Sequence, residues 1–226
     1  MGEVKHPARI PADSVLLDAD LALPDNAKAI VLFAHGSGSS RHSSRNRYVA
    51  EVLRAGGLGT LLMDLLTKEE DAVYETRFDI DLLTKRLAAA TRWLAGRSET
   101  RSLRIGYFGA STGAAAALKA AAAIPSIGAV VSRGGRPDMA VSSLVRVSAP
   151  TLLIVGGHDD VVIELNQRAF QKLKAEKKLV IVPGATHLFE EPGALEEVAR
   201  LASEWFRRHL TSQHPQGTAA ASKVPR

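Results

Sequence analysis

The sequence predicts an α/β protein with a mostly parallel sheet of about eight strands and helices on both faces. From residue 30 onward, short apolar runs of strand length alternate with longer stretches of helical periodicity. The run at residues 29–34, AIVLFA, contains no polar residue, as expected of a strand buried on both faces. A length of 226 residues with 46% hydrophobic and 23% charged residues fits one large globular domain.

The chain divides into elements in the following order. Residues 4–10 and 14–23 predict two antiparallel strands joined by the turn Pro11-Ala12-Asp13. Further strands are expected at residues 29–34, 58–66, 103–108, 127–131, 151–155 and 178–182. Helices are expected at residues 46–56, 78–96, 114–123, 164–175 and 193–210, with a charged surface excursion at 68–76 and a loop at 132–138. We expect a single domain over residues 1–210 and a disordered tail over 211–226, which is polar and contains two prolines.

Composition excludes several classes of function. The chain has no cysteine, which rules out disulfides, cysteine-ligated zinc and thiol catalysis. Neither a signal peptide nor a membrane span is predicted, so we expect a cytoplasmic protein without a membrane partner. The net charge is +5, but the basic residues form no stripe interleaved with aromatics, so no nucleic-acid partner is expected.

The motif Gly109-x-Ser111-x-Gly113 lies between a predicted strand and an alanine-rich helix. A nucleophile elbow needs this strand–turn–helix context, because a sharp turn holds the serine hydroxyl above the sheet. Glycines on either side allow strand and helix to approach closely, and the free N–H groups of the helix point at the serine. The same pentapeptide also occurs in ordinary turns rich in glycine and alanine, so the rest of the chain must supply the context.

Polar residues that suit nucleophilic catalysis follow later strands. Asp159 comes after the strand at 151–155, and His187 comes after the strand at 178–182. The carboxyl ends of parallel strands meet at one sheet edge, where ligands bind. We expect Ser111 to be the nucleophile, His187 its general base and Asp159 the acid that orients the imidazole. Asp160 is the alternative acid, and Asp159 can instead cap a turn.

Two backbone amides are expected to stabilise an oxyanion. The Thr112 N–H begins the helix after the nucleophile, and the Ser37 N–H lies in the loop after the first parallel strand. His35 is expected to brace this loop through hydrogen bonds. No histidine–carboxylate cluster has metal-ligand spacing, and no phosphate-binding or dinucleotide motif is present, so we expect neither a metal nor a cofactor.

Taken together, these motifs resemble the α/β-hydrolase superfamily, and within it the small dienelactone hydrolase-like group. The matching residues are His35-Gly36-x-Gly38, Gly109-x-Ser111-x-Gly113, Gly156-x-x-Asp159-x-x-Val162 and Gly184-x-x-His187-x-Phe189. The resemblance places the acid at Asp159. It implies hydrolysis of an ester, thioester or lactone through an acyl-enzyme, hence a carboxylic ester hydrolase acting on a small molecule.

The chain departs from that group in one respect. Dienelactone hydrolase has a cysteine at the elbow where this chain has Ser111, so the dienelactone substrate is not transferred. Fewer than 20 residues separate the strands at 127–131 and 151–155, which leaves no room for a large lid. The resemblance also admits acyl transfer to an alcohol or amine, and a non-catalytic receptor on the same fold is a further alternative. We expect a monomer or homodimer.

Several basic residues on the loops are candidates for binding an anionic substrate, because a guanidinium matches the geometry of a carboxylate or phosphate. Solvation at the surface is the competing interpretation of the same residues. The candidates are Arg41, His42, Arg45, Arg133 and Arg136.

Overall fold

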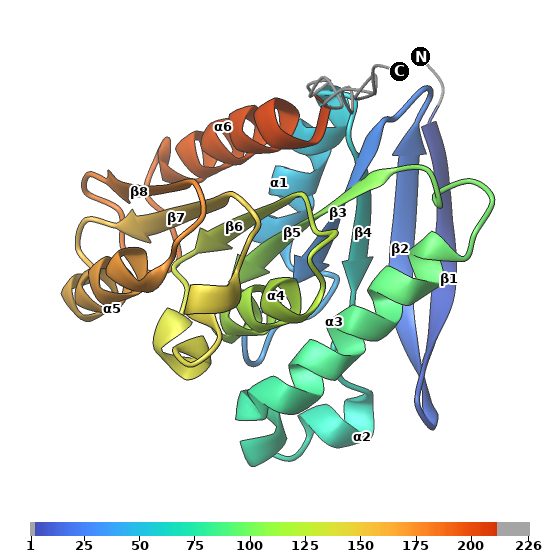
Figure 1. Cartoon of the computed structure of the whole chain (residues 1–226), viewed down its shortest axis with the longest axis horizontal. Helices are drawn as coiled ribbons and strands as arrows, with labels where there is room; N and C mark the ends of the chain where they lie inside the picture. Colours follow the sequence, from blue (N-terminus) through green and yellow to red (C-terminus); the bar gives the residue numbers. More distant parts are fainter. Residues whose placement is uncertain (1–2, 212–226) are drawn as a thin grey trace, which may run out of the picture.

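Eight strands form one sheet in the order β1-β2-β4-β3-β5-β6-β7-β8 in a computed structural model that describes residues 3–211 (Figure 1). The strands are β1 (Glu3–Ala12), β2 (Val15–Pro24), β3 (Ala29–Ala34), β4 (Gly59–Met63), β5 (Arg104–Ala110), β6 (Ala129–Arg133), β7 (Thr151–Gly156) and β8 (Lys177–Val182). The α-helices are α1 (Ser44–Ala55), α2 (Lys68–Asp71), α3 (Ile80–Ala95), α4 (Thr112–Ala123), α5 (Asp160–Lys172) and α6 (Ala194–Phe206). The predicted fold class and the mostly parallel sheet are confirmed.

The antiparallel part of the sheet is confined to its beginning. β1 and β2 form a hairpin in which Ala12 pairs with Val15, and β2 then pairs antiparallel with β4. Asp13 in the hairpin turn has φ 54°, a left-handed conformation that a short polar side chain tolerates better than a branched one. From β4 to β8 every pairing is parallel, so these strands all direct their carboxyl ends to the same edge.

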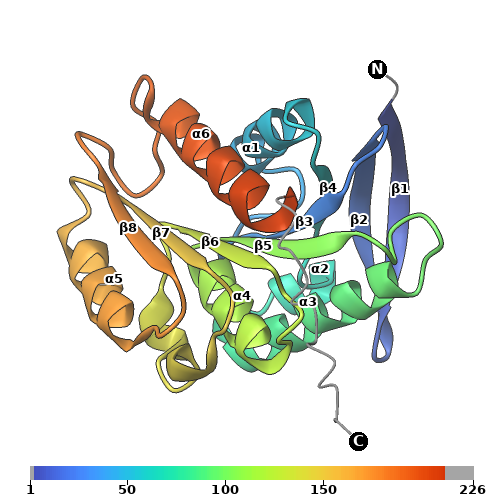
Figure 2. The ribbon, with the colours of Figure 1, turned by 45° about the horizontal axis from the view of Figure 1, so that its top comes forward.

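Helices cover both faces of the sheet, as Figures 1 and 2 show. α1 and α6 lie on one face, where residues such as Val49 and Phe206 pack against Val31 and Phe33 of β3. α3, α4 and α5 lie on the other face, against the alternate residues of the same strands. Burial of apolar side chains on two faces is the main stabilising contribution to this architecture.

The alanine-rich helix α4 packs directly against the central strands. The small side chains of Ala114, Ala115, Ala116 and Ala117 are fully buried, so the helix lies close to the sheet. Close packing by alanine keeps the first turn of α4 near the end of β5 and fixes the position of the residue between them.

Some boundaries differ from those expected. β6 extends to Arg133, because Ser132 and Arg133 pair with Leu153 and Ile154 of β7. α5 begins at Asp160, four residues earlier than expected. The surface excursion contains α2 and a 3₁₀ turn at Glu75–Phe78, with Thr67 capping α2 through Glu70.

The connection between β6 and β7 and the last described turn bear on the expected absence of a lid and on the expected tail. The segment from β6 to β7 contains only the 3₁₀ turns Pro137–Ala140 and Leu144–Arg146, which agrees with the absence of a large lid. Thr211 belongs to the π-helical turn Arg207–Thr211, whereas residues 212–226 of the expected tail lie outside the described residues. Within residues 3–211, no helix is long and apolar enough to cross a bilayer.

Candidate active site

Ser111 occupies a strained position between β5 and α4. Its backbone has φ 50° and ψ −120°, a conformation that residues other than glycine rarely adopt. Such strain costs on the order of 1–3 kcal/mol and is concentrated at functional sites. A Cβ at Gly109 would lie 2.4 Å from the Cα of Ala114, and one at Gly113 would lie 2.1 Å from the oxygen of Ala34. Both glycines of the motif are therefore required by backbone packing around the serine.

His187 and Asp159 form a hydrogen-bonded pair. His187 Nδ1 lies 2.6 Å from Asp159 Oδ2, and with an ionised carboxylate the ring N–H is the donor. Asp159 follows β7 and His187 follows the neighbouring strand β8, so parallel pairing brings the two loops together. The Asp159 side chain is in the N-cap position of α5 but makes no capping hydrogen bond. Asp160, the alternative acid, is an exposed residue in the first turn of α5.

His187 lies beside the backbone at the end of β6, to which the Ser111 amide is hydrogen-bonded. The Ser111 N–H donates to the carbonyl of Arg133 at 3.2 Å, which joins the elbow to the end of β6. The residue after Arg133 is Gly134, which has φ +52°. If Gly134 had a Cβ, that atom would lie 3.4 Å from Cε1 of His187, so the imidazole ring lies beside this glycine. The imidazole therefore lies against the backbone that directly adjoins Ser111.

The two expected oxyanion donors also lie near the serine. A Cβ at Gly36, next to Ser37, would lie 3.1 Å from Ser111 Cβ, so this loop contacts the elbow. Thr112 is the first residue of α4, where backbone N–H groups have no partner within the helix. The Ser37 N–H, however, donates to the Thr112 hydroxyl at 2.9 Å. An oxyanion that used the Ser37 amide would have to displace this hydroxyl.

His35 forms hydrogen bonds that hold the loop after β3 in place. The Leu65 N–H donates to His35 Nε2 at 3.0 Å, an arrangement that requires the unprotonated nitrogen. Burial is the main cause that lowers the pKa of His35 below its ordinary value of 6.5. The imidazole is therefore neutral at physiological pH and holds β3 and the chain after β4 together.

The lowered pKa of His35 predicts a pH dependence of stability. Below pH 6.5, His35 is protonated in the unfolded chain but stays neutral in the folded chain. Because the unfolded state then binds more protons, the free energy of unfolding falls as the pH decreases. One such group contributes a slope of at most about 1.4 kcal/mol per pH unit. We expect urea denaturation between pH 8 and pH 5 to show this loss in the wild type. The His35→Gln variant should show a smaller slope, and equal slopes would contradict the assignment.

The candidate arginines differ in what they contact. Arg41 pairs with Asp64 and lies 3.8 Å from carboxylate oxygens of both Asp18 and Asp20. Arg136 forms two hydrogen bonds to Asp138, at 2.9 and 2.8 Å.

The remaining candidates have fewer acidic contacts. Arg45 donates to Glu190 at 2.8 Å. His42 lies exposed in its loop. Arg133 is buried at the end of β6, where the sequence predicted a loop, and its Nε and Nη1 atoms have no hydrogen-bond partner within the described part of the chain.

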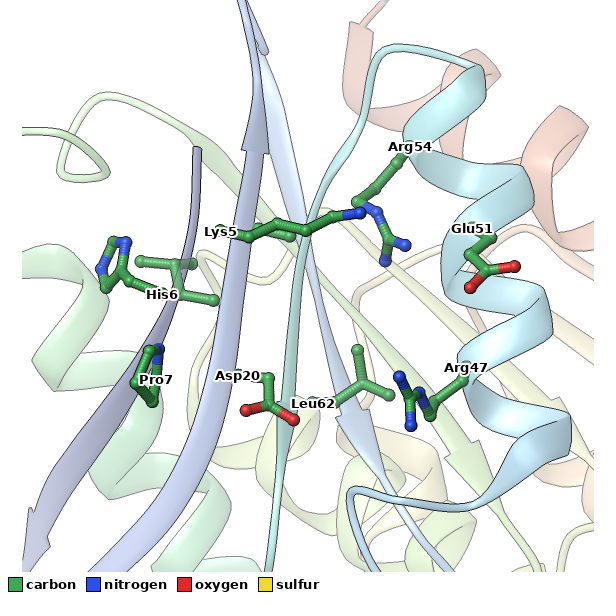
Figure 3. A pocket seen from close by; sticks show the side chains of 10 residues that line it. Lys5, His6, Pro7, Asp20, Arg47, Glu51, Arg54 and Leu62 are labelled. Carbon is green, nitrogen blue, oxygen red and sulfur yellow. The ribbon is translucent and has the colours of Figure 1, made fainter. Parts of the chain in front are cut away.

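A cavity of about 320 Å³ lies at the side of the sheet that β1 and β2 form, between this hairpin and α1 (Figure 3). Figure 3 shows Lys5, Asp20, Arg47 and Glu51 around it, which are charges of both signs. The residues that line this cavity do not include Ser111, Asp159 or His187. The candidate chemistry therefore lies at the carboxyl edge of the strands and away from this cavity.

The strand order and the two helix layers are those of the α/β-hydrolase fold. Residues 17–211 match the model of the dienelactone hydrolase family, and the chain belongs to that family. A crystal structure of a dienelactone hydrolase from Anabaena variabilis superposes with a TM-score of 0.90 at 56% identity, over 92% of this chain and 99% of that one.

Other proteins are similar to this chain in fold or in sequence. Est1E from Butyrivibrio proteoclasticus, solved with ferulic acid bound, has a TM-score of 0.78 at 18% identity, over 91% of this chain and 100% of that one. A Mycobacterium tuberculosis protein named "Putative phosphoribosyl transferase" is 58% identical over 210 residues, which are 92% of this chain and 47% of that protein. The chain thus spans about half the length of the curated relatives it matches.

Proposed function

We propose that the chain is a serine hydrolase that cleaves a small ester, thioester or lactone through an acyl-enzyme intermediate. The observation that carries the proposal is the 2.6 Å hydrogen bond between His187 Nδ1 and Asp159 Oδ2, next to a serine held in an elbow conformation. Membership of the dienelactone hydrolase family supports a hydrolase. The finer assignment, to a carboxylic ester and to these three residues, is ours.

In the proposed mechanism, His187 Nε2 accepts the proton of Ser111 as its oxygen attacks the carbonyl carbon. Asp159 keeps the Nδ1 proton in place and stabilises the imidazolium that forms. The tetrahedral oxyanion is stabilised by the Thr112 N–H and, once the threonine hydroxyl has moved, by the Ser37 N–H. His187 then gives the proton to the leaving group, and the bond between the acyl carbon and the leaving group breaks. A water molecule next attacks the acyl carbon while His187 takes its proton. The bond to Ser111 breaks, and His187 returns the proton to the serine oxygen.

Replacing Asp159 and Asp160 one at a time tests which of them is the acid that orients His187. In Asp159→Asn the carboxylate that orients His187 is lost, and we expect kcat for a 4-nitrophenyl ester to fall by about 10²–10⁴-fold. Asp160→Asn removes the same charge one position along the chain, from an exposed side chain, and is the matched control. It should retain kcat within about threefold. Equal losses in both variants, or a larger loss in Asp160→Asn, would contradict the role of Asp159.

Two alternatives remain under the same fold. An acyltransferase would hand the acyl group to an alcohol or amine, so adding either acceptor to the ester assay would yield a new ester or amide in place of the free acid. A receptor would bind an ester without turnover. A panel of chromogenic esters that varies acyl length and charge separates turnover from binding alone, and analysis of the acyl product with an acceptor present separates hydrolysis from acyl transfer. The proposal expects free acid as the main product.

A further inference from the structure

Arg133 carries a buried positive charge, and no residue among those the structure describes places a counter-ion within hydrogen-bonding distance of it. The residue is 8% exposed, and its Nε and Nη1 atoms are buried with no hydrogen-bond partner among residues 3–211. Leaving a guanidinium in this state is costly, since buried charges are normally paired and hydrogen-bonded. Arg41 and Arg136 are more exposed than Arg133, and both have carboxylate partners.

The surroundings of Arg133 add positive potential instead of cancelling it. Its Cζ atom lies 5.9 Å from the centre of the Phe189 ring, and the charge that acts on it is that of Arg45. Burial, and secondarily this like charge, lower the pKa of Arg133 to about 10, so the side chain stays protonated at neutral pH. Arg45 Nε is also buried without a partner, while its Nη1 donates to Glu190.

Arg133 adjoins the proposed reacting centre through its backbone. Arg133 pairs with Ala110 across the sheet, and its carbonyl accepts the N–H of Ser111. The residue after it, Gly134, contacts His187, and Phe189 is two positions beyond that histidine. Arg45 lies in the first turn of α1, a helix of 12 residues whose free N–H groups and dipole favour an anion.

We propose that Arg133, together with Arg45, binds an anionic group of the substrate, a carboxylate or a phosphate, beside the ester that Ser111 attacks. This inference rests on the proposed function and names the substrate class of that site. A planar guanidinium can hold two oxygens of either anion at once, which fixes orientation as well as charge. The cost of burying Arg133 unpaired is then recovered when the anion binds.

Two esters that differ only in charge test whether the site prefers an anionic substrate. The anionic probe is 4-nitrophenyl hydrogen glutarate, and its neutral twin is methyl 4-nitrophenyl glutarate, which differs only in the masked carboxylate. We expect the wild type to favour the anionic ester in kcat/KM, and Arg133→Met to lower that preference by about 10–100-fold, as the loss of a charge-assisted hydrogen bond implies. Arg45→Met, at a less buried position, should lower it less. Arg47→Met removes an exposed charge from the same helix and should leave the preference unchanged. An unchanged preference in both Arg133→Met and Arg45→Met would overturn the proposal.

A second measurement does not depend on turnover. In the Ser111→Ala background, glutarate and inorganic phosphate are added separately while the Tm is followed. We expect at least one of them to raise the Tm, and the anion that does so identifies the group bound. Arg133→Met should abolish this shift and also raise the Tm of the unliganded protein, because an unpaired buried charge is removed. If Arg133 were only structural, the variant would lower the Tm and neither anion would have acted on the parent.

The two measurements separate this inference from the proposed function. Anion stabilisation that depends on Arg133, without hydrolysis of any ester, would support the anion site and refute the hydrolase. Hydrolysis of both esters with equal kcat/KM, and no anion effect on the Tm, would refute the anion site and leave the hydrolase standing.

Discussion

Replacing Ser111 with alanine is expected to lower kcat for ester hydrolysis by about 10⁴–10⁶-fold, the loss typical of removing a serine nucleophile. The substitution removes the attacking oxygen but leaves the elbow, the His187–Asp159 pair and the oxyanion amides in place. Some acceleration over water should remain from those amides and from binding. The measurement is kcat with a 4-nitrophenyl ester under saturating conditions, with active enzyme quantified in the wild type by burst titration.

A matched serine variant and a folding measurement accompany this test. Ser142→Ala changes an exposed serine between β6 and β7 and should keep full activity. The Tm of Ser111→Ala should equal or exceed that of the wild type, since alanine meets the same backbone strain and buries no hydroxyl. A Ser111→Ala protein that is folded and keeps more than a tenth of the wild-type kcat would show that another group is the nucleophile.

The second large effect is on stability. In Gly113→Ala the new Cβ would lie 2.1 Å from the oxygen of Ala34 and 2.4 Å from that of His35. Both obstacles are backbone oxygens, one in the last residue of β3 and one directly after it. Neither can rotate away, so α4 must move outward from a close-packed interface. We expect a loss of at least about 3 kcal/mol in the free energy of unfolding, or failure to accumulate as folded protein.

Gly96→Ala is the control for this substitution. Gly96 follows α3 with φ −87°, and the nearest atom to a new Cβ would be 3.6 Å away. Alanine can adopt this conformation, so the free energy of unfolding should change by less than about 1 kcal/mol. Urea denaturation measures both variants. Equal midpoints for Gly113→Ala and the wild type would contradict the packing of the elbow described above.

Much of the fold could be predicted because its signals are local. The apolar run of β3 matches its prediction at both ends, since a strand buried on both faces consists mostly of apolar residues. The hairpin of β1 and β2 follows from its turn, and α4 from its alanines. The elbow motif is likewise local, because strand, serine and helix are consecutive, and parallel pairing then brings Asp159 and His187 to the same edge.

Other features depend on contacts between distant residues and leave no local pattern. Arg45 and Glu190 are 145 positions apart and meet only because α1 and the loop after β8 share one edge of the sheet. β6 reaches Arg133 because β7 supplies partners, so the sequence placed this arginine in a loop. The hydrogen bond from Ser37 to Thr112 joins residues 75 positions apart. The sequence identified the arginines as candidates but could not show which of them lacks a carboxylate.

Ser111 is the activated nucleophile of the proposed reaction. The most direct test of this role is reaction of the folded protein with a fluorophosphonate probe, followed by intact mass and peptide mapping. We predict one phosphonyl adduct per chain, located on Ser111 and absent from Ser111→Ala. A folded wild-type protein that forms no adduct, or forms it on a different serine, would contradict the account.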